Sequence, residues 1–197
     1  MSHVLIVAEA GVNHNGSLDR ALEMVDVAAG CGADVVKFQT FNSDALATGN
    51  APKADYQKVT TDAGESQLEM LRKLELGVEA HQALVRRCAE KKIAFLSTPF
   101  DMKSLDLLVN DINLKTLKIG SGELTNAPLL HAAALSGRDI ILSTGMATLH
   151  EVRLSLGVLA HGYLGSDAAG SDAFLSAYGS ADGHAALKAH VTLLHCT

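Results

Sequence analysis

The chain has 197 residues, of which 48% are hydrophobic and 19% charged. This composition is too apolar for a disordered protein, and the length is sufficient for one buried core. The 16 basic and 22 acidic residues give a formal net charge of -6, and no run of lysine or arginine is present to follow a phosphate backbone. Nucleic-acid binding is therefore not expected.

The cysteines and the N-terminus indicate a soluble cytoplasmic protein without a membrane partner. Cys31, Cys88 and Cys196 lack both metal-ligand spacing and a disulfide framework, which is typical of reduced thiols in the cytosol. The apolar run Val4–Ala8 stops at Glu9, too soon for a signal peptide or a membrane span.

Short apolar runs rich in Val, Ile and Leu recur along the chain and predict buried parallel strands. They are Val4–Ala8, Ala33–Val36, Ile93–Leu96, Leu114–Ile119, Asp139–Leu142 and Val191–Leu194. Helical patterns separate these runs. The alternation of strands with helices predicts an α/β protein with right-handed crossovers.

Five helices are expected, most of them with a local signal for the start. The first is capped by Ser17 and ends at Gly30 and Gly32. The second covers about 78–91, and the third follows Asp101. The last two are marked by Pro128 in a first turn and by the capping-box spacing of 148–151.

The polar residues favour a closed (β/α)8-type (TIM) barrel over an open doubly wound sheet. A nucleotide-binding sheet carries a glycine-rich phosphate loop after its first strand, and residues 9–16 do not form one. Chemically capable residues instead follow nearly every strand, as they do at the mouth of a barrel. They are Glu9, Lys37, Gln39, Ser97, Thr98, Lys118, Ser121, Ser143, Thr144 and His195.

A barrel needs eight strands and typically about 250 residues, whereas about six are found here. We therefore expect residues 1–197 to be the N-terminal part of an incomplete barrel, with its last strands absent and its sheet edges open or paired with another chain. Two segments lengthen the regular spacing. Residues 41–67 are expected to cover the site, and the Gly/Ala/Ser-rich stretch 162–184 belongs to the opposite side.

Lys37 and Lys118 each end an otherwise apolar strand, where an uncompensated ammonium is costly to bury. An anion is expected near them, since neighbouring strand ends supply hydroxyl groups and the glycines at 120 and 122 let backbone amides approach a phosphate. The pattern indicates a small phosphorylated or carboxylated substrate. A purely structural alternative is that each lysine pairs with Glu9 or Glu123.

Glu9 is the candidate general acid or base, with an ion pair to Lys37 as its structural alternative. His14 and His195 are expected at the barrel mouth, although two histidines alone do not make a metal site. The helix and loop histidines 81, 131, 150, 161, 184 and 190 are expected at the surface, and Cys88 in the core.

At these same residues the chain resembles the sialic acid synthase family, in six ordered stretches that cover the whole chain. They are Ile6–Gly16, Gly32–Thr40, Leu96–Asp101, Lys118–Glu123, Leu142–Met146 and Leu194–Thr197. The insert at 50–58 resembles the branch that uses N-acetylmannosamine or the related legionaminic acid precursor, more than the pseudaminic branch.

The resemblance implies the role of each candidate site residue. Phosphoenolpyruvate would be held by Lys37, Thr98, Lys118, Ser121 and Ser143. The sugar pocket would be lined by Gln39, Phe100 and Glu123. A divalent metal, usually manganese, is held in the family by two histidines from the last barrel strands, and an antifreeze-like C-terminal domain reaches over the partner's site. Both are expected beyond Thr197, in a full-length homodimer.

The implied function is N-acetylneuraminate synthase, a phosphoenolpyruvate-dependent transferase of sialic acid biosynthesis. It would condense phosphoenolpyruvate with N-acetylmannosamine and water, releasing phosphate, with Glu9, Lys37 and Lys118 as the catalytic residues. The alternatives are a synthase for legionaminic acid or another nonulosonic acid, and a non-catalytic fragment that binds an anion or a partner barrel. Residues 1–197 alone are expected to have negligible synthase activity.

Overall fold

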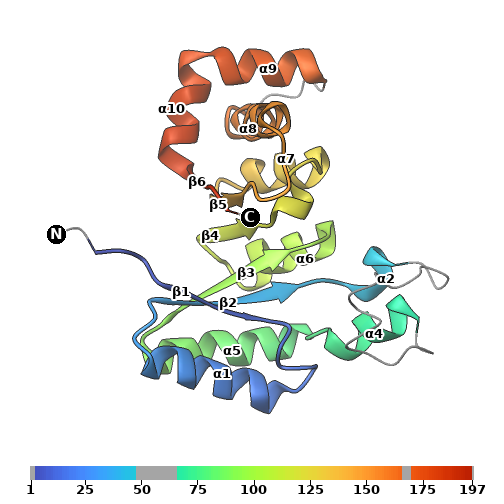
Figure 1. The fold of residues 1–197 in the computed structure, drawn as a ribbon, viewed down its shortest axis with the longest axis vertical. Helices are drawn as coiled ribbons and strands as arrows, with labels where there is room; N and C mark the ends of the chain where they lie inside the picture. Colours follow the sequence, from blue (N-terminus) through green and yellow to red (C-terminus); the bar gives the residue numbers. More distant parts are fainter. Residues whose placement is uncertain (1–2, 48–65, 166–169, 197) are drawn as a thin grey trace. The chain divides into compact units, whose positions relative to one another are not determined.

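The computed structural model describes residues 3–47, 66–165 and 170–196. The chain divides into two compact units, Met1–Leu107 and Leu108–Thr197, coloured blue to green and yellow to red in Figure 1. Each unit holds a three-stranded sheet in sequential order, β1-β2-β3 in the first and β4-β5-β6 in the second. All the pairings are parallel, which confirms the α/β class.

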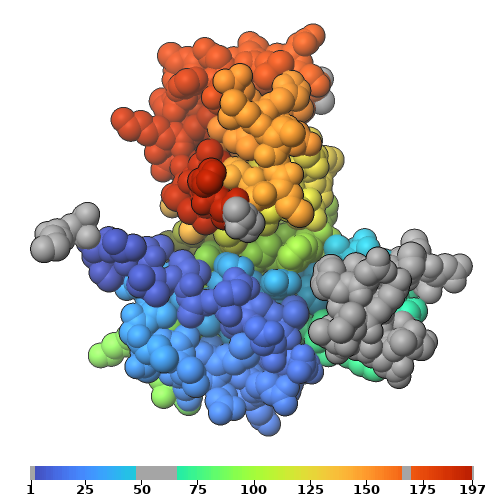
Figure 2. Space-filling model, viewed as in Figure 1, coloured from blue at the N-terminus to red at the C-terminus, as the bar shows by residue number. Residues whose placement is uncertain are grey.

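The first sheet consists of β1 (Val7–Gly11), β2 (Val35–Thr40) and β3 (Ala94–Pro99). β1 begins at Val7 rather than Val4, because pairing with β2 starts opposite Val35. The residues before it, Val4–Ile6, are 51–71% exposed and project from the surface (dark blue in Figure 2). The later start places Glu9 inside the strand, directly opposite Lys37, instead of at the strand's end.

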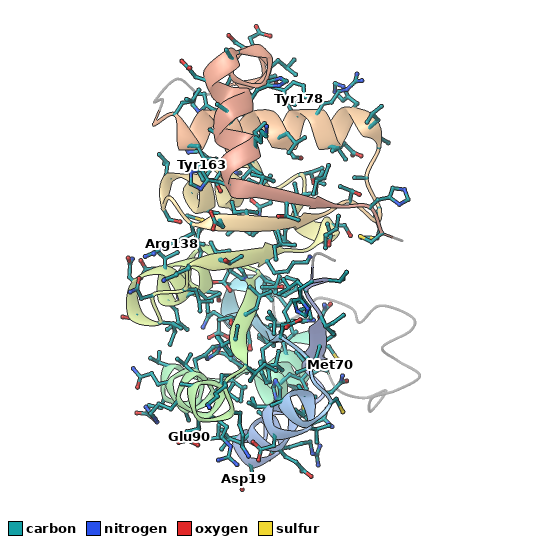
Figure 3. The ribbon with its side chains drawn as sticks, turned by 90° about the vertical axis from the view of Figure 1, so that its left-hand side faces the viewer. Asp19, Met70, Glu90, Arg138, Tyr163 and Tyr178 are labelled. Atoms are coloured by element: carbon teal, nitrogen blue, oxygen red, sulfur yellow. The ribbon has the colours of Figure 1, made fainter. Side chains whose placement is uncertain are left out.

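Helices α1 (Leu18–Gly30) and α5 (Val78–Lys91) contact each other and cover the same face of this sheet (Figure 1). Both were predicted, and Ser17 caps α1 by accepting a hydrogen bond from the backbone of Arg20. The core lies between the helices and the strands, with Phe38 and Leu84 fully buried. Charged residues face outward, as Asp19 and Glu90 do in Figure 3.

Short helices follow β2 and β3. After β2 come α2 (Ser43–Leu46) and α4 (Gln67–Leu74), which the sequence analysis did not predict. After β3, α6 (Met102–Asp106) begins after Asp101, as expected, and continues into a π-helical turn, Leu107–Asp111; the Asp101 side chain caps it. The part of the insert at 48–65, including the stretch used to assign the sugar branch, lies outside the described residues.

The second sheet consists of β4 (Thr116–Ile119), β5 (Asp139–Ser143) and β6 (Val191–Leu194). Helices α7 (Ala127–Leu135) and α8 (Leu149–Tyr163) begin where predicted, with a proline in the first turn of α7 and a complete capping box at the start of α8. The Tyr163 hydroxyl donates a 2.6 Å hydrogen bond to the carbonyl of Arg138, which fastens α8 beside β5 (Figure 3).

The Gly/Ala/Ser-rich stretch contains two helices that the sequence analysis missed, α9 (Ser171–Gly179) and α10 (Ala181–His190). One glycine in α8 and one in α10 allow close backbone contacts in this layer. A Cβ atom on Gly157 of α8 would lie 2.5 Å from the carbonyl oxygen of Phe174, and one on Gly183 of α10 would lie 1.9 Å from that of Ala177. The composition of this stretch therefore did not predict that its helices pack against α8.

The sequential strand order in each sheet is the one that a barrel requires. The described residues form two three-stranded sheets rather than one of six strands, so the barrel stays a prediction. The structure does not test the single-domain assignment of residues 1–197 either. No helix in the described part of the chain is both long and apolar enough to cross a membrane.

Candidate functional site

Glu9 and Lys37 form an ion pair between their carboxylate and ammonium groups. The two residues are directly opposite in the register of β1 and β2, so their side chains leave the sheet on the same face. Lys37 is mostly buried, with 13% of its side chain exposed, whereas Glu9 is 49% exposed. The ion pair with Glu9, which was the structural alternative for Lys37, is therefore present in the structure.

Gln39 lies on the same face as Lys37, because alternate residues of a strand share a face. The intervening Phe38 is fully buried on the opposite face, against the helices. Gln39 is paired in register with Thr98 of β3. A bulge after Glu9 leaves Gly11 at φ +55°, and a Cβ atom there would lie 3.0 Å from the Glu9 carboxylate.

Phe100 immediately follows β3, and its backbone N–H donates to the carbonyl of Thr40. Four of the predicted site residues, Glu9, Lys37, Gln39 and Thr98, thus share one face of the first sheet. This face combines one cation, one carboxylate and neutral hydrogen-bonding groups. Such a set can bind an anion and move a proton.

Lys118 and Ser143 are joined across β4 and β5 in the second unit. The Lys118 ammonium donates hydrogen bonds to the Ser143 hydroxyl at 2.6 Å and to the carbonyl of Ile119 at 2.9 Å. Lys118 is only 9% exposed. A cation held this deeply beside a hydroxyl group favours an anionic ligand, which would offset the cost of its desolvation.

Ser121 and Glu123 lie in the short helical turn Ser121–Glu123, directly after β4. The Glu123 carboxylate accepts a 2.8 Å hydrogen bond from the side-chain amide of Asn126, which in turn caps α7. Both predicted residues therefore follow the strand that carries Lys118. Both are partly exposed.

The environment of the Cys196 thiol, near the ends of β5 and β6, stabilises negative charge. The pKa of the thiol is lowered from the usual value, chiefly by the backbone N–H of Thr144 and then by the Ser143 hydroxyl, with a further contribution from the Lys118 charge. The Thr144 hydroxyl donates to the carbonyl of Leu194, which holds the two strand ends together. Groups that stabilise a thiolate here are equally suited to a carboxylate or phosphate oxygen.

Of the two histidines expected at a barrel mouth, His195 is exposed but His14 is fully buried. The Nδ1 atom of His14 accepts a hydrogen bond from the backbone of Gly16, so Nε2 carries the proton, and no described residue accepts it. Burial lowers the pKa of His14, with further lowering by His81 and Arg20.

The residues present do not fit a divalent metal ion. Within residues 3–47, 66–165 and 170–196, no group of three or more His, Cys, Asp or Glu side chains is placed to hold one. The manganese expected from the resemblance, with its histidines beyond residue 197, stays a prediction.

Two histidines expected at the surface are buried instead. His81 is 1% exposed and His161 3% exposed, because each lies on the inner side of its helix, α5 or α8. His161 is hydrogen-bonded to His131, and His81 to Thr40. Cys88 is buried in the core as predicted, and burial raises the pKa of its thiol to about 12.

Comparison with known proteins places this arrangement in a family. The model of the NeuB family matches residues 24–197, nearly the whole chain. The chain belongs to the NeuB family. Its strand-end lysines and hydroxyl groups are therefore features of a NeuB protein, and the resemblance found in the sequence is confirmed.

Three relatives show how far the similarity extends. The chain is 45% identical, over its whole length, to an N,N'-diacetyllegionaminic acid synthase of Campylobacter jejuni, and 42% identical over 98% of its length to one of Legionella pneumophila. It spans 52% and 48% of these relatives, about half of each. The chain also resembles a crystal structure of a sialic acid synthetase from Leptospira borgpetersenii in complex with citrate, with a TM-score of 0.73 and 31% sequence identity. The match covers the whole of this chain and 55% of the synthetase chain.

Proposed function

We propose that this chain provides the phosphoenolpyruvate-binding part of a nonulosonic acid synthase. The observation that carries the proposal is the buried Lys118 ammonium bonded to the Ser143 hydroxyl at adjacent strand ends. Lys37, on a strand of the other unit, is the second proposed cation. Membership of the family supports the same assignment.

The proposed acceptor sugar carries two acetamido groups, by analogy with the two N,N'-diacetyllegionaminic acid synthases that the chain resembles. From the sequence alone, N-acetylneuraminate synthase was the main prediction, with a legionaminic acid synthase as the alternative. The relatives support that alternative better. N-acetylmannosamine is retained as the second candidate, since the chain also resembles a sialic acid synthetase in structure.

The proposed reaction forms one carbon–carbon bond and one carbon–oxygen bond to water, and it breaks the carbon–oxygen bond to phosphate. C3 of phosphoenolpyruvate attacks the aldehyde carbon of the open-chain sugar, water adds at C2, and phosphate leaves from C2. Lys37 and Lys118 would stabilise the phosphate and carboxylate charges throughout. No step is assigned to a metal ion.

Glu9 is the proposed proton-transfer group. Its carboxylate is half exposed and already paired with Lys37, so it lies close to the point where an anion bound by that lysine would react. A carboxylate so placed can take a proton from the attacking water or return one to the intermediate. Gln39, Phe100 and Glu123 are proposed to contact the sugar, and Thr98 and Ser121 the phosphoenolpyruvate.

We further propose that the two sheets are consecutive parts of one (β/α)8 barrel in the complete protein, and that the protein acts as a homodimer. The sequential strand order within each sheet supports the first proposal. In a barrel the carboxyl ends of all the strands face one mouth, so both lysines would serve a single substrate.

The function is tested by phosphate release from phosphoenolpyruvate with manganese and each candidate sugar in turn. The assay compares residues 1–197 with a version extended by the C-terminal half that the relatives possess. The extended protein is expected to release phosphate faster with the diacetamido sugar than with N-acetylmannosamine, and residues 1–197 alone at least about a thousandfold more slowly. Absence of sugar-dependent phosphate release from the extended protein would contradict the proposal.

A further inference from the structure

A continuous chain of buried side-chain hydrogen bonds lies behind the first sheet. The Thr40 hydroxyl oxygen is 2.8 Å from Nε2 of His81 and 2.6 Å from the hydroxyl oxygen of Ser97. Thr40, His81 and Ser97 are all at most 2% exposed. The chain links the ends of β2 and β3 to the first turns of α5.

The direction of these hydrogen bonds follows from one contact. Nδ1 of His81 is 2.9 Å from the carbonyl oxygen of Gly77, which can only accept, so Nδ1 carries the ring proton. In the neutral ring, Nε2 is then an acceptor. The Thr40 hydroxyl must donate to it, and the Ser97 hydroxyl must donate to Thr40.

The His81 ring is held in this neutral form and orientation by its surroundings. Burial lowers its pKa, so the ring is uncharged at neutral pH. The ring packs perpendicular to that of Phe95, with ring centroids 6.3 Å apart and an angle of 87° between the planes. The ring is therefore a fixed acceptor for Thr40.

Thr40 and Ser97 are each next in sequence to a proposed substrate-contacting residue. Neighbouring residues of a strand point to opposite faces, so Gln39 and Thr98 leave the sheet on the side away from His81. Gln39 and Thr98 are themselves paired in register. Fixing Thr40 against Ser97 on one face therefore fixes the spacing of Gln39 and Thr98 on the other.

We propose that His81 is a positioning residue which, through Thr40 and Ser97, holds the ends of β2 and β3 in the arrangement that binds phosphoenolpyruvate. The inference rests on the proposed function for its ligand, but not for the hydrogen bonds themselves. His81 touches no substrate and acts only through the two strands. Its contribution is to binding geometry rather than to chemistry.

Threonine 40 offers a matched pair of variants. Thr40→Val keeps the shape of the side chain and removes the hydroxyl group, whereas Thr40→Ser keeps the hydroxyl group. Thr40→Val is expected to weaken phosphoenolpyruvate binding about three- to tenfold by calorimetric titration, since the buried hydrogen bonds to both His81 and Ser97 are lost, and Thr40→Ser by less than about twofold. Equal affinities of wild type and a folded Thr40→Val would overturn the inference.

Nitrogen-15 NMR of the His81 ring gives an independent readout. At pH 7.5 the proton is expected on Nδ1 in the wild type and in Thr40→Ser, and Nε2 should shift toward the value of an unbonded acceptor in Thr40→Val. A proton on Nε2 in the wild type would overturn the proposed chain. Should Thr40→Val fail to fold, Ser97→Ala, which removes only the last donor, is expected to weaken binding to a similar extent, and unchanged binding would count against the inference.

The two proposals fail in different ways. If the wild-type chain does not bind phosphoenolpyruvate, the proposed ligand is wrong, and so is the proposal that His81 positions the strands for that ligand. The NMR signal of the wild type still decides whether the hydrogen-bonded chain exists. If binding occurs but is indifferent to the Thr40 hydroxyl group, the function stands and the positioning role is rejected.

Discussion

Glu9 and Lys37 occupy directly opposite positions on β1 and β2, and their side chains form an ion pair on the face of the first sheet away from α1 and α5. The positive charge of Lys37 is thus already compensated by Glu9. An anion bound by Lys37 is therefore repelled by the Glu9 carboxylate, unless that carboxylate takes up a proton. This relation makes opposite predictions for the two partners.

Glu9→Gln is expected to bind phosphoenolpyruvate about fivefold more tightly, because one unit of repulsion near the ligand is removed in a partly exposed site. Lys37→Met should bind about tenfold to a hundredfold more weakly, since a charge-assisted contact is lost. Calorimetric titration of both variants at one salt concentration measures this. Weaker binding by Glu9→Gln would place its carboxylate among the groups that hold the ligand instead.

Cys196 is expected to report ligand binding through its reactivity. Its lowered pKa increases the thiolate fraction at pH 7.5, so iodoacetamide should modify it rapidly, while the buried Cys88, with a pKa of about 12, reacts only after unfolding. Phosphoenolpyruvate bound by Lys118 and Ser143 should slow the modification. Mass spectrometry of the alkylated peptides measures both rates, and the exposed Cys31 is the internal control. Equal slowing at both exposed cysteines would argue against a ligand at Lys118.

Gly16 is expected to tolerate no side chain. Its φ is +76°, and a Cβ atom would lie 2.0 Å from the carbonyl oxygen of Lys73 at the end of α4. Gly32 has a similar φ of +80° but free space around it. Gly32→Ala should therefore cost only the backbone strain of about 1–2 kcal/mol, and Gly16→Ala clearly more. Urea unfolding of the two variants makes the comparison, and equal losses would mean that the contact with α4 is not maintained in solution.

Stability should decline between pH 7.5 and pH 5.0. Burial lowers the pKa of both His14 and His81 from 6.5, so the folded state favours their neutral forms. Their contribution is complete above about pH 6.5 and is lost as the pH falls toward the lower pKa values of the folded state. The decline is measured as the change in the urea midpoint of unfolding between the two pH values. The change should be smaller in His81→Gln and the same as in the wild type in His184→Gln, a variant of an exposed residue. A midpoint that rises on acidification would contradict the buried, neutral assignment.

The sequence predicted the elements better than their assembly. All six strands and the five expected helices were found, because buried strands and helix caps leave local signals such as Ser17 and the capping box at Thr148. Helices α9 and α10 were missed because the stretch is rich in Gly, Ala and Ser, and Gly183 in α10 serves packing rather than a turn. The start of β1 was misplaced, because pairing opposite Val35 decides it.

For the candidate site, the residue types at strand ends singled out Lys37, Lys118 and Ser143 as candidates, but they did not predict the partners of these side chains. The Glu9–Lys37 pair was considered only as an alternative, and the Lys118–Ser143 contact depends on the register of β4 and β5. The burial of His81 depends on which side of α5 meets the sheet. The sequence offers little to predict it, because the partners of His81 are Gly77, four residues earlier, and Thr40, 41 residues earlier at the end of a strand.

The most direct test of the proposed anion site is a calorimetric titration of phosphoenolpyruvate into the wild-type chain and into Lys118→Met. Lys118 is buried and bonded to Ser143, so its loss removes a charge-assisted contact worth roughly 1.5–3 kcal/mol. The account predicts that Lys118→Met binds about tenfold to a hundredfold more weakly while its urea midpoint shows that it remains folded. An unchanged affinity in the folded variant would contradict the assignment of Lys118 to the phosphoenolpyruvate site.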